Sequence, residues 1–447
     1  MPKMMTAALW AVTLALALAV GPAPGAELAT PDDTARFLAG LPPAPDSPLA
    51  ALAKDPLWQQ HARHFDSIFG HEDSTTLAKI RAFSRERLSD KHATMLYMFS
   101  GPDFLYAVTF FPNASTYVLS GLEPVGDIPQ LTELKHWTIE QSLQNIENSL
   151  GSLLNFSFFI TRNMKTQLNA GPVYGTLPIL YVFLARTGKS IHDVSLVSLD
   201  AEGNIQPPSE LRGKNAAYSA AKGVKIVFSA ADGPRQTLYY FSTNLDDGSV
   251  ARSGFLAFCG KLGVADSFLK SASYLLHGGG FTKVRGFLLE HSATIVEDDS
   301  GIPLAYFDRK KWRLQPFGRY FGPLALFGRS YQPDMAELFR KSNATPLDFG
   351  LGYRWRPNES NLLLAQKVAA GTSETELTPD LPADRYPHRT QVRRRHEVQP
   401  RPKAKAARES PPLHRKQVED TSTGSSGCFF LFCSTSPAEA SQPRAPK

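Results

Sequence analysis

The amino-acid composition of this chain changes abruptly near Gly371. Residues 30–368 alternate apolar runs with polar turns, whereas residues 371–447 are rich in Pro, Arg and Lys and poor in large apolar side chains. Because a segment of that composition buries too little apolar surface to offset the entropy of its chain, we predict that residues 371–447 are disordered. The folded part is therefore expected to end near Val368.

The first residues are typical of a secretory signal peptide. Lys3 precedes an apolar run at residues 7–20, Gly21 then breaks any helix, and Ala26 offers a small residue for cleavage. The run is shorter than the roughly 20 apolar residues that a spanning helix needs, and no later stretch is long and apolar enough. We therefore predict that residues 1–26 are removed, that the mature chain has no transmembrane helix, and that the protein is exported, periplasmic or secreted.

The patterning of residues 27–370 predicts an α+β fold. The hydrophobic fraction of 42% is that of a globular protein. Residues 27–89 carry apolar side chains at helical spacing, and β-rich runs then alternate with amphipathic segments. We expect a helical N-terminal segment followed by mostly antiparallel strands with packed helices.

Residues 90–222 and 223–370 are expected to form two α+β units. The runs "YMFSGPDFLYAVTFF" and "IVFSAADGPRQTLYYF" both suggest two strands around a turn, and two helices and a strand follow each of them. In the second unit those helices are residues 266–277 and 281–292, and further strands are expected at residues 310–321 and 349–368. An internal duplication of β-β-α-α-β units is one interpretation, and chance recurrence in an α+β chain is the other.

Two segments resemble a family of exported bacterial proteins of no established function. They are "YMFSGPDFLYAVTFFPNASTYVLSGLEPVG" (residues 97–126) and "VEDDSGIPLAYFDRKKWRLQPFGRY" (residues 296–320). The resemblance spans most of residues 30–368 and leaves out the basic tail. It implies that both segments belong to one folded unit, and it brings no activity, ligand or catalytic residue.

Carboxylates at turns that follow strands are the first candidates for a catalytic site. Asp103 lies in "SGPDF", and Asp298 and Asp299 lie in "VEDDSG". Under the duplication, Asp200 and Glu202 would occupy the turn that matches Asp298 and Asp299. Paired carboxylates can act as general acid and base or bind a cation. Asp before Gly is also ordinary turn chemistry, so the catalytic role stays open.

The run "HGGG", which begins at His277, resembles the oxyanion-hole loop of some esterases. The chain lacks the G-x-S-x-G motif that would supply the nucleophile. We therefore interpret the three glycines as the end of one helix and a turn into the next, and keep His277 as a secondary candidate. The run "ARTGKS" similarly lacks the first glycine of a phosphate-binding loop, because position 183 is Phe183. Gly188 is better explained as a helix C-cap, and we expect no cofactor.

His61 and His64 lie three residues apart on one expected helix and could share a metal ion. Neighbouring Arg63 and Gln60 favour a solvated helix face instead, and no H-E-x-x-H motif is present. We expect no metal site.

The predicted tail carries clustered cations that would attract anionic polymers in a salt-dependent way. The candidates for this contact are Arg393, Arg394, Arg395, Arg401, Lys403 and Lys405. In an exported protein we expect lipid head groups or envelope glycans rather than nucleic acid, and a solvated linker is the alternative.

The tail also contains "CFFLFC", in which Cys428 and Cys433 could form a disulfide in an oxidising compartment. The run could enter a membrane interface beside the basic segment, bind a partner, or be a terminal extension without a role. Cys259, in the folded part, is expected to be a small buried hydrophobe.

The sequence favours a non-enzymatic, envelope-associated or secreted binding protein whose cationic tail contacts anionic surfaces. Its partner would be an unknown protein or an envelope polymer. An exported hydrolase that uses the turn carboxylates is the alternative. The sequence itself assigns no enzymatic activity, ligand or oligomeric state.

Overall fold

The computed structural model describes residues 28–88, 92–156, 171, 173–208, 221–271 and 274–368. The expected signal peptide, the basic tail with its candidate cations, and the Cys428–Cys433 pair lie outside the described residues.

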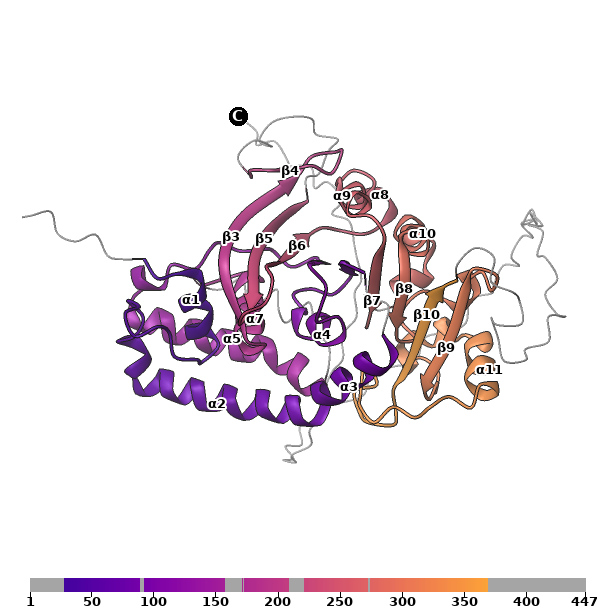
Figure 1. Cartoon of the computed structure of the whole chain (residues 1–447), viewed down its shortest axis with the longest axis horizontal. Coiled ribbons are helices and arrows are strands. Elements are labelled where there is room, and N and C mark those ends of the chain that lie inside the picture. Colours follow the sequence, from indigo (N-terminus) through magenta and orange to yellow (C-terminus); the bar gives the residue numbers. More distant parts are fainter. Residues whose placement is uncertain are drawn as a thin grey trace, which may run out of the picture. The chain divides into compact units, whose positions relative to one another are not determined.

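The described part has an α+β fold built on one ten-stranded mixed sheet (Figure 1). The strand order is β4-β3-β5-β6-β2-β1-β7-β8-β10-β9. The strands are β1 (Thr94–Tyr97), β2 (Thr116–Gly121), β3 (Lys189–Leu199), β4 (Ile205–Gln206), β5 (Lys222–Ala230), β6 (Gln236–Ser242), β7 (Ala265–Leu269), β8 (Ser292–Glu297), β9 (Trp312–Gly318) and β10 (Asn361–Lys367).

The centre of the sheet is parallel, which the sequence did not predict. Strands β6, β2, β1, β7 and β8 run in one direction. Antiparallel strands flank them, with β5, β3 and β4 on one side and β10 and β9 on the other. The expectation of a mostly antiparallel sheet therefore holds only for its two margins.

Helices cover both faces of the sheet (Figure 1). The longer ones are α1 (Pro31–Leu38), α2 (Pro56–Glu72), α3 (Ala78–Arg87), α4 (Phe104–Phe110), α5 (His136–Phe156), α7 (Leu177–Arg186), α9 (Phe255–Lys261), α10 (Thr282–His291) and α11 (Pro333–Lys341). A π-helical stretch (Asp73–Leu77) joins α2 to α3, and the short helix α8 (Asp247–Val250) precedes α9.

The pleat of the strands divides the apolar core into two layers. In β1, Met95 and Tyr97 face the core that holds α1 to α5 and α7, whereas Leu96 faces the core that holds α8 to α11. Successive side chains of a strand point to opposite faces, so a sheet covered on both faces needs apolar residues at consecutive positions.

Two predicted elements are wrong. Because of these errors the sequence analysis did not predict that the centre of the sheet is parallel. Residues 104–110, expected as a strand, form α4, which begins where the Asp103 carboxylate accepts a hydrogen bond from the Tyr106 amide. The first part of residues 266–277, expected as a helix, is strand β7, and a 3₁₀ turn (Leu275–His277) follows. Both are short segments buried on all sides, so their sequences carry no amphipathic period that separates helix from strand.

The order of elements differs between the two segments for which an internal duplication was one of two interpretations. The first segment runs β1-α4-β2-α5-α7-β3, and the second runs β5-β6-α8-α9-β7-α10-β8. Strands β1 and β2 are parallel, whereas β5 and β6 form an antiparallel hairpin. Residues 349–360, expected to begin a strand and end in a hairpin turn, form a loop with one bridge between Leu351 and Arg354.

Other expectations are confirmed. The N-terminal segment is helical, β8 enters the "EDDSG" turn, and α7 ends with Gly188 at a φ of +68°. Cys259 is buried with a free thiol. Among the helices of the described residues, none is both long and apolar enough to cross a membrane.

Candidate functional site

The carboxyl ends of the parallel strands bring together residues that are far apart in the sequence. From β1 the chain moves to β2 on one side, and it later crosses to β7 and β8 on the other side of β1. This reversal places a topological switch point between β1 and β7. In open α/β sheets, ligands bind at the carboxyl ends of the strands at such a point.

A buried ion pair lies at the switch point. Lys270, directly after β7, has its ammonium nitrogen 2.7 Å from a carboxylate oxygen of Asp103, in the loop after β1. Each side chain is 2% exposed. The distance is that of an ion pair. Burial lowers the pKa of Lys270, and the Asp103 charge opposes that shift.

Tyrosines and a glutamate extend this pair into the helical layer. The Tyr97 hydroxyl donates to Asp103 at 3.0 Å, and the Lys270 ammonium lies 3.5 Å from the centre of the Tyr106 ring. The Tyr106 hydroxyl donates to Glu72, at the end of α2, at 2.9 Å. Burial raises the pKa of Glu72, and the hydrogen bond from Tyr106 opposes that shift.

Asp298 follows the adjacent strand β8 and is fully enclosed. Its carboxylate accepts hydrogen bonds from the Ser271 amide at 3.1 Å, the Ser300 amide at 3.0 Å and the Ser300 hydroxyl at 2.5 Å. Burial, and then the neighbouring Asp299 charge, raise the pKa of Asp298 to about 7. Asp298 is therefore an acid that can hold a proton near neutral pH.

Asp299 links the same edge to the outer strands. Its carboxylate accepts from the Tyr274 hydroxyl at 2.9 Å and from the side-chain amide of Asn361 at 3.0 Å. Burial raises the pKa of Asp299, whereas the hydrogen bond from Asn361 and the charge of Arg354 lower it. Every oxygen of this carboxylate is thus engaged within the fold.

His277 lies beside this segment, and its Nε2 has no hydrogen-bond partner among the described residues. Its ring contacts Tyr274, with centroids 5.2 Å apart. Burial lowers the pKa of His277 to about 4, against the opposing effect of backbone hydrogen bonds at Asp299 and Gly301. The imidazole is therefore neutral at pH 7. The glycines after it lead through a second 3₁₀ turn (Gly279–Phe281) into α10, and the helix expected before them is absent.

A loop closes over the carboxylates. Gly352 has a φ of +58°, and a Cβ at this position would lie 2.1 Å from a carboxylate oxygen of Asp298. The neighbouring Tyr353 hydroxyl donates to the Ser271 carbonyl at 3.5 Å. The side chains of Asp103, Lys270 and Asp298 are consequently shielded from solvent by packed protein.

The exposed chemistry beside this loop is cationic and aromatic. Residues 319–331 and 350–357 contain four arginines and no Asp or Glu. We call their solvent-facing part the Arg-aromatic surface; it comprises Arg319, Tyr320, Phe321, Phe327, Arg329, Tyr331, Tyr353, Arg354, Trp355 and Arg356.

Ring and guanidinium contacts join several members of this surface. The Tyr320 and Tyr331 rings stack with centroids 5.9 Å apart, and the Arg354 guanidinium lies 5.8 Å from the Phe321 ring centre. Arg354 also donates to the Gly322 carbonyl at 2.9 Å. Three rings, those of Phe321, Tyr331 and Trp355, are 57%, 53% and 39% exposed.

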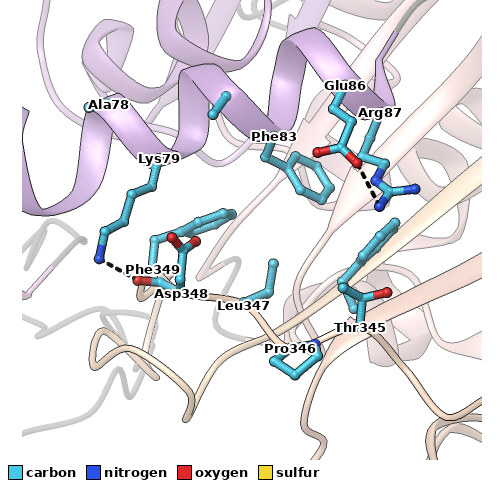
Figure 2. Close-up of a pocket in the computed structure, with 12 residues that line it drawn as sticks. Ala78, Lys79, Phe83, Glu86, Arg87, Thr345, Pro346, Leu347, Asp348 and Phe349 are labelled. Atoms are coloured by element: carbon cyan, nitrogen blue, oxygen red, sulfur yellow. Dashed lines mark hydrogen bonds and ion pairs between the residues drawn. The ribbon is translucent and has the colours of Figure 1, made fainter.

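An apolar hollow of about 370 Å³ lies between α3 and residues 345–349 (Figure 2). Phe83, Phe317 and Phe349 line it. Three of its charged side chains are engaged, since Lys79 donates to the Asp348 backbone carbonyl at 2.7 Å and Arg87 pairs with Glu86 at 2.8 Å. The Asp348 side chain also lines the hollow and forms no ion pair within the described residues, so the hollow combines apolar surface with a carboxylate.

The remaining sequence candidates have local roles. Both ring nitrogens of buried His61 are engaged, one with Glu147 at 2.6 Å and the other with the Leu38 carbonyl at 2.9 Å. Asp200 closes its own turn by accepting from the Asn204 amide at 2.7 Å. No group of three or more His, Cys, Asp or Glu side chains suited to a metal ion occurs among the residues that the structure covers.

The sequence analysis named four catalytic candidates, and three of them, Asp103, Asp298 and Asp299, place their carboxylates at this edge of the sheet. It missed Lys270, Tyr106 and Glu72. A lysine at the end of a short apolar run, as in "ADSFLK", was the available signal for Lys270. The Arg-aromatic surface was also missed, although its composition is readable in "GRYFGPLALFGRSY" and "GLGYRWRP".

Comparison of the chain with family models, with curated proteins and with solved structures finds no match. The candidate site is thus characterised by its own geometry. That geometry has two parts: a buried network of carboxylates around Lys270 and, outside it, the Arg-aromatic surface.

Proposed function

We propose that this chain is a non-enzymatic binding protein, exported and associated with the bacterial envelope, that attaches to anionic surfaces. The observation that carries the proposal is the Arg-aromatic surface, where exposed rings and guanidinium groups gather. Arg356 lies 3.9 Å from the Glu359 carboxylate, whereas Arg319 and Arg329 form no ion pair within the described residues. Aromatic and arginine side chains are enriched at binding interfaces, and arginine recognises carboxylate and phosphate groups. The signal-peptide-like N-terminus supports export.

The buried network supports a binding role over a catalytic one. Asp103 starts α4 and pairs with Lys270, and Asp298 and Asp299 accept hydrogen bonds from neighbouring backbone and side-chain groups. A catalytic acid or base must come within hydrogen-bond reach of a substrate proton. The hydrogen bonds and the ion pair of these carboxylates are instead made to groups of the fold itself.

The cationic tail would add a second attachment to the same kind of surface. Two weak attachments joined in one chain bind more tightly than either alone. The partner would accordingly be an acidic lipid head group or an acidic envelope glycan that both segments can contact.

Sedimentation with lipid vesicles tests this function. The variant Arg329→Gln/Arg356→Gln removes two exposed charges from the surface, and Arg63→Gln/Arg235→Gln removes two exposed charges elsewhere. Each basic side chain near an anionic bilayer contributes about 1 kcal/mol, so the first variant should partition about 30-fold more weakly into phosphatidylglycerol vesicles. The control variant should partition like the native chain.

Two further arms separate the contributions. Deletion of residues 371–447 should weaken vesicle binding and reduce its dependence on salt. An acidic polysaccharide offered in place of vesicles distinguishes a glycan from a lipid partner. Equal binding by the native chain, the surface variant and the deletion would refute the proposal.

A hydrolase that uses the buried carboxylates is the second candidate. The observation that favours it is the meeting of Asp103, Lys270 and Asp298 at a topological switch point, where the raised pKa of Asp298 provides a proton donor. Access would require the loop at Gly352 to open. Hydrolysis of nitrophenyl ester, phosphate or glycoside substrates that is lost in Asp298→Asn but kept in the exposed-site variant Asp348→Asn would support it.

A further inference from the structure

A second hollow, of about 600 Å³, lies where α2, α4 and the end of α7 meet. Its volume is within the range of small-molecule sites. Apolar side chains from three elements line it: Phe69 of α2, Leu105 and Val108 of α4, Leu77 and Pro112. These residues provide an apolar wall for a compact hydrophobic group.

The helix that forms one side of this hollow has an irregular turn. Between Glu72 and Ala78 the backbone follows a π-helix, and both Asp73 and Leu77 of this turn line the hollow. Single π turns inside α-helices occur frequently at functional sites. The wider turn therefore adds an observation that is independent of the shape of the hollow.

Of the three cationic side chains that line the hollow, two are paired with carboxylates and one is not. Arg186 pairs with Asp66 at 2.6 Å, and Arg81 pairs with Asp73 at 2.7 Å. Lys189, the first residue of β3, also lines the hollow and has no carboxylate within ion-pair distance in the part of the chain that the structure describes.

The environment of Lys189 favours a bound anion. Burial of this side chain lowers the pKa of Lys189, because no neighbouring charge offsets the loss of hydration. A carboxylate, sulfonate or phosphate beside the ammonium group would offset it. The run "ARTGKS" thus contributes a cation to a hollow, although it ends a helix and begins a strand instead of forming a phosphate-binding loop.

We propose that this hollow binds a small amphipathic anion, whose apolar body packs against Phe69, Leu105 and Val108 and whose anionic group pairs with Lys189. This site is separate from the Arg-aromatic surface and does not depend on its role.

A pair of fluorescent probes with the same aromatic body tests the charge. Anilinonaphthalene sulfonate is anionic, whereas phenylnaphthylamine is neutral. In the full-length protein, Lys189→Met should weaken binding of the sulfonate about tenfold, the effect of one charge-assisted hydrogen bond, and leave the neutral probe unchanged. Lys225→Met, on the neighbouring strand β5, is the control and should change neither probe.

A pair of glycine variants tests the location. Gly70 lines the hollow on α2, and Gly286 lies on α10; an added Cβ meets no atom within 4 Å at either position. Leucine also favours helix over glycine at both, so both variants should fold. Gly70→Leu should abolish binding of both probes, whereas Gly286→Leu should bind them as the native protein does.

Each outcome bears on the proposal. Failure of the native protein to bind the sulfonate, equal binding by Lys189→Met, or equal binding by Gly70→Leu and Gly286→Leu would overturn it. Near-ultraviolet circular dichroism of each variant separates a lost site from a lost fold. Should Gly70→Leu fail to fold, the Lys189→Met comparison still decides the assignment.

Discussion

The ammonium group of Lys270 lies 2.7 Å from the carboxylate of Asp103, across the switch point between β7 and β1. Both side chains are almost fully shielded from solvent. Two buried charges stabilise a fold only as a pair, because removal of one leaves the other without compensation for its lost hydration. The pair therefore fixes how the two strands meet at their carboxyl ends.

We predict that Lys270→Met lowers the free energy of unfolding by about 3–5 kcal/mol, the usual cost of breaking a buried ion pair. The double variant Asp103→Asn/Lys270→Met should lose less than Lys270→Met alone, since no uncompensated charge remains. Urea denaturation measures both. Lys341→Met, which breaks the exposed 2.6 Å pair with Glu337, should leave the midpoint unchanged. A Lys270→Met variant as stable as the native protein would contradict the prediction.

The raised pKa of Asp298 predicts a loss of stability as the pH rises. The folded pKa is about 7, against an ordinary value of 3.8, so the folded state holds a proton that the unfolded chain releases between these values. The stabilising contribution is fully present below pH 3.8 and is lost as the pH rises through 7. Urea midpoints of native protein and Asp298→Asn, measured from pH 5 to pH 8, should therefore converge or cross, with the native curve falling more steeply. Parallel curves would count against a protonated Asp298.

Part of this site could be predicted from the sequence. Asp103, Asp298 and Asp299 follow apolar runs at turns, which is a local pattern, and the structure places all three at one edge of the sheet. The prediction that Gly188 ends α7 also relied on a local sequence pattern. These predictions needed only the properties of neighbouring residues.

The rest depended on contacts that the sequence does not encode locally. Strand β7 has five buried residues and no alternation, so its periodicity could not distinguish it from a helix. Because β7 was not recognised as a strand, the contact between Lys270 and Asp103 could not be predicted. The parallel order of β6, β2, β1, β7 and β8 likewise rests on pairings between residues far apart in the chain.

His277 predicts a pH dependence of the opposite sign. Burial lowers its folded pKa to about 4 from 6.5, so between these values the unfolded chain binds a proton that the folded state excludes. Stability from this group is present above pH 6.5 and is lost as the pH falls through 4. The difference in urea midpoint between native protein and His277→Gln should change across that window. The exposed-histidine variant His71→Gln should show no such change, and a constant difference for His277→Gln would refute the prediction.

Two glycines that share a left-handed backbone allow strain to be separated from crowding. Gly254 has a φ of +68° and Gly263 a φ of +80°. A Cβ at Gly254 would lie 1.9 Å from the Asp200 carbonyl oxygen, whereas none of the described atoms lies within 4 Å of one at Gly263. Gly263→Ala should therefore cost about 1–2 kcal/mol, the strain of a left-handed alanine.

Gly254→Ala should lose about 1–3 kcal/mol more than Gly263→Ala, because the turn after β3 must move away from the start of α9. Thermal and urea denaturation of the two variants, side by side, measure the difference. Equal losses would show that the turn at Asp200 yields without cost and that its contact with α9 does not help to fix the edge of the sheet.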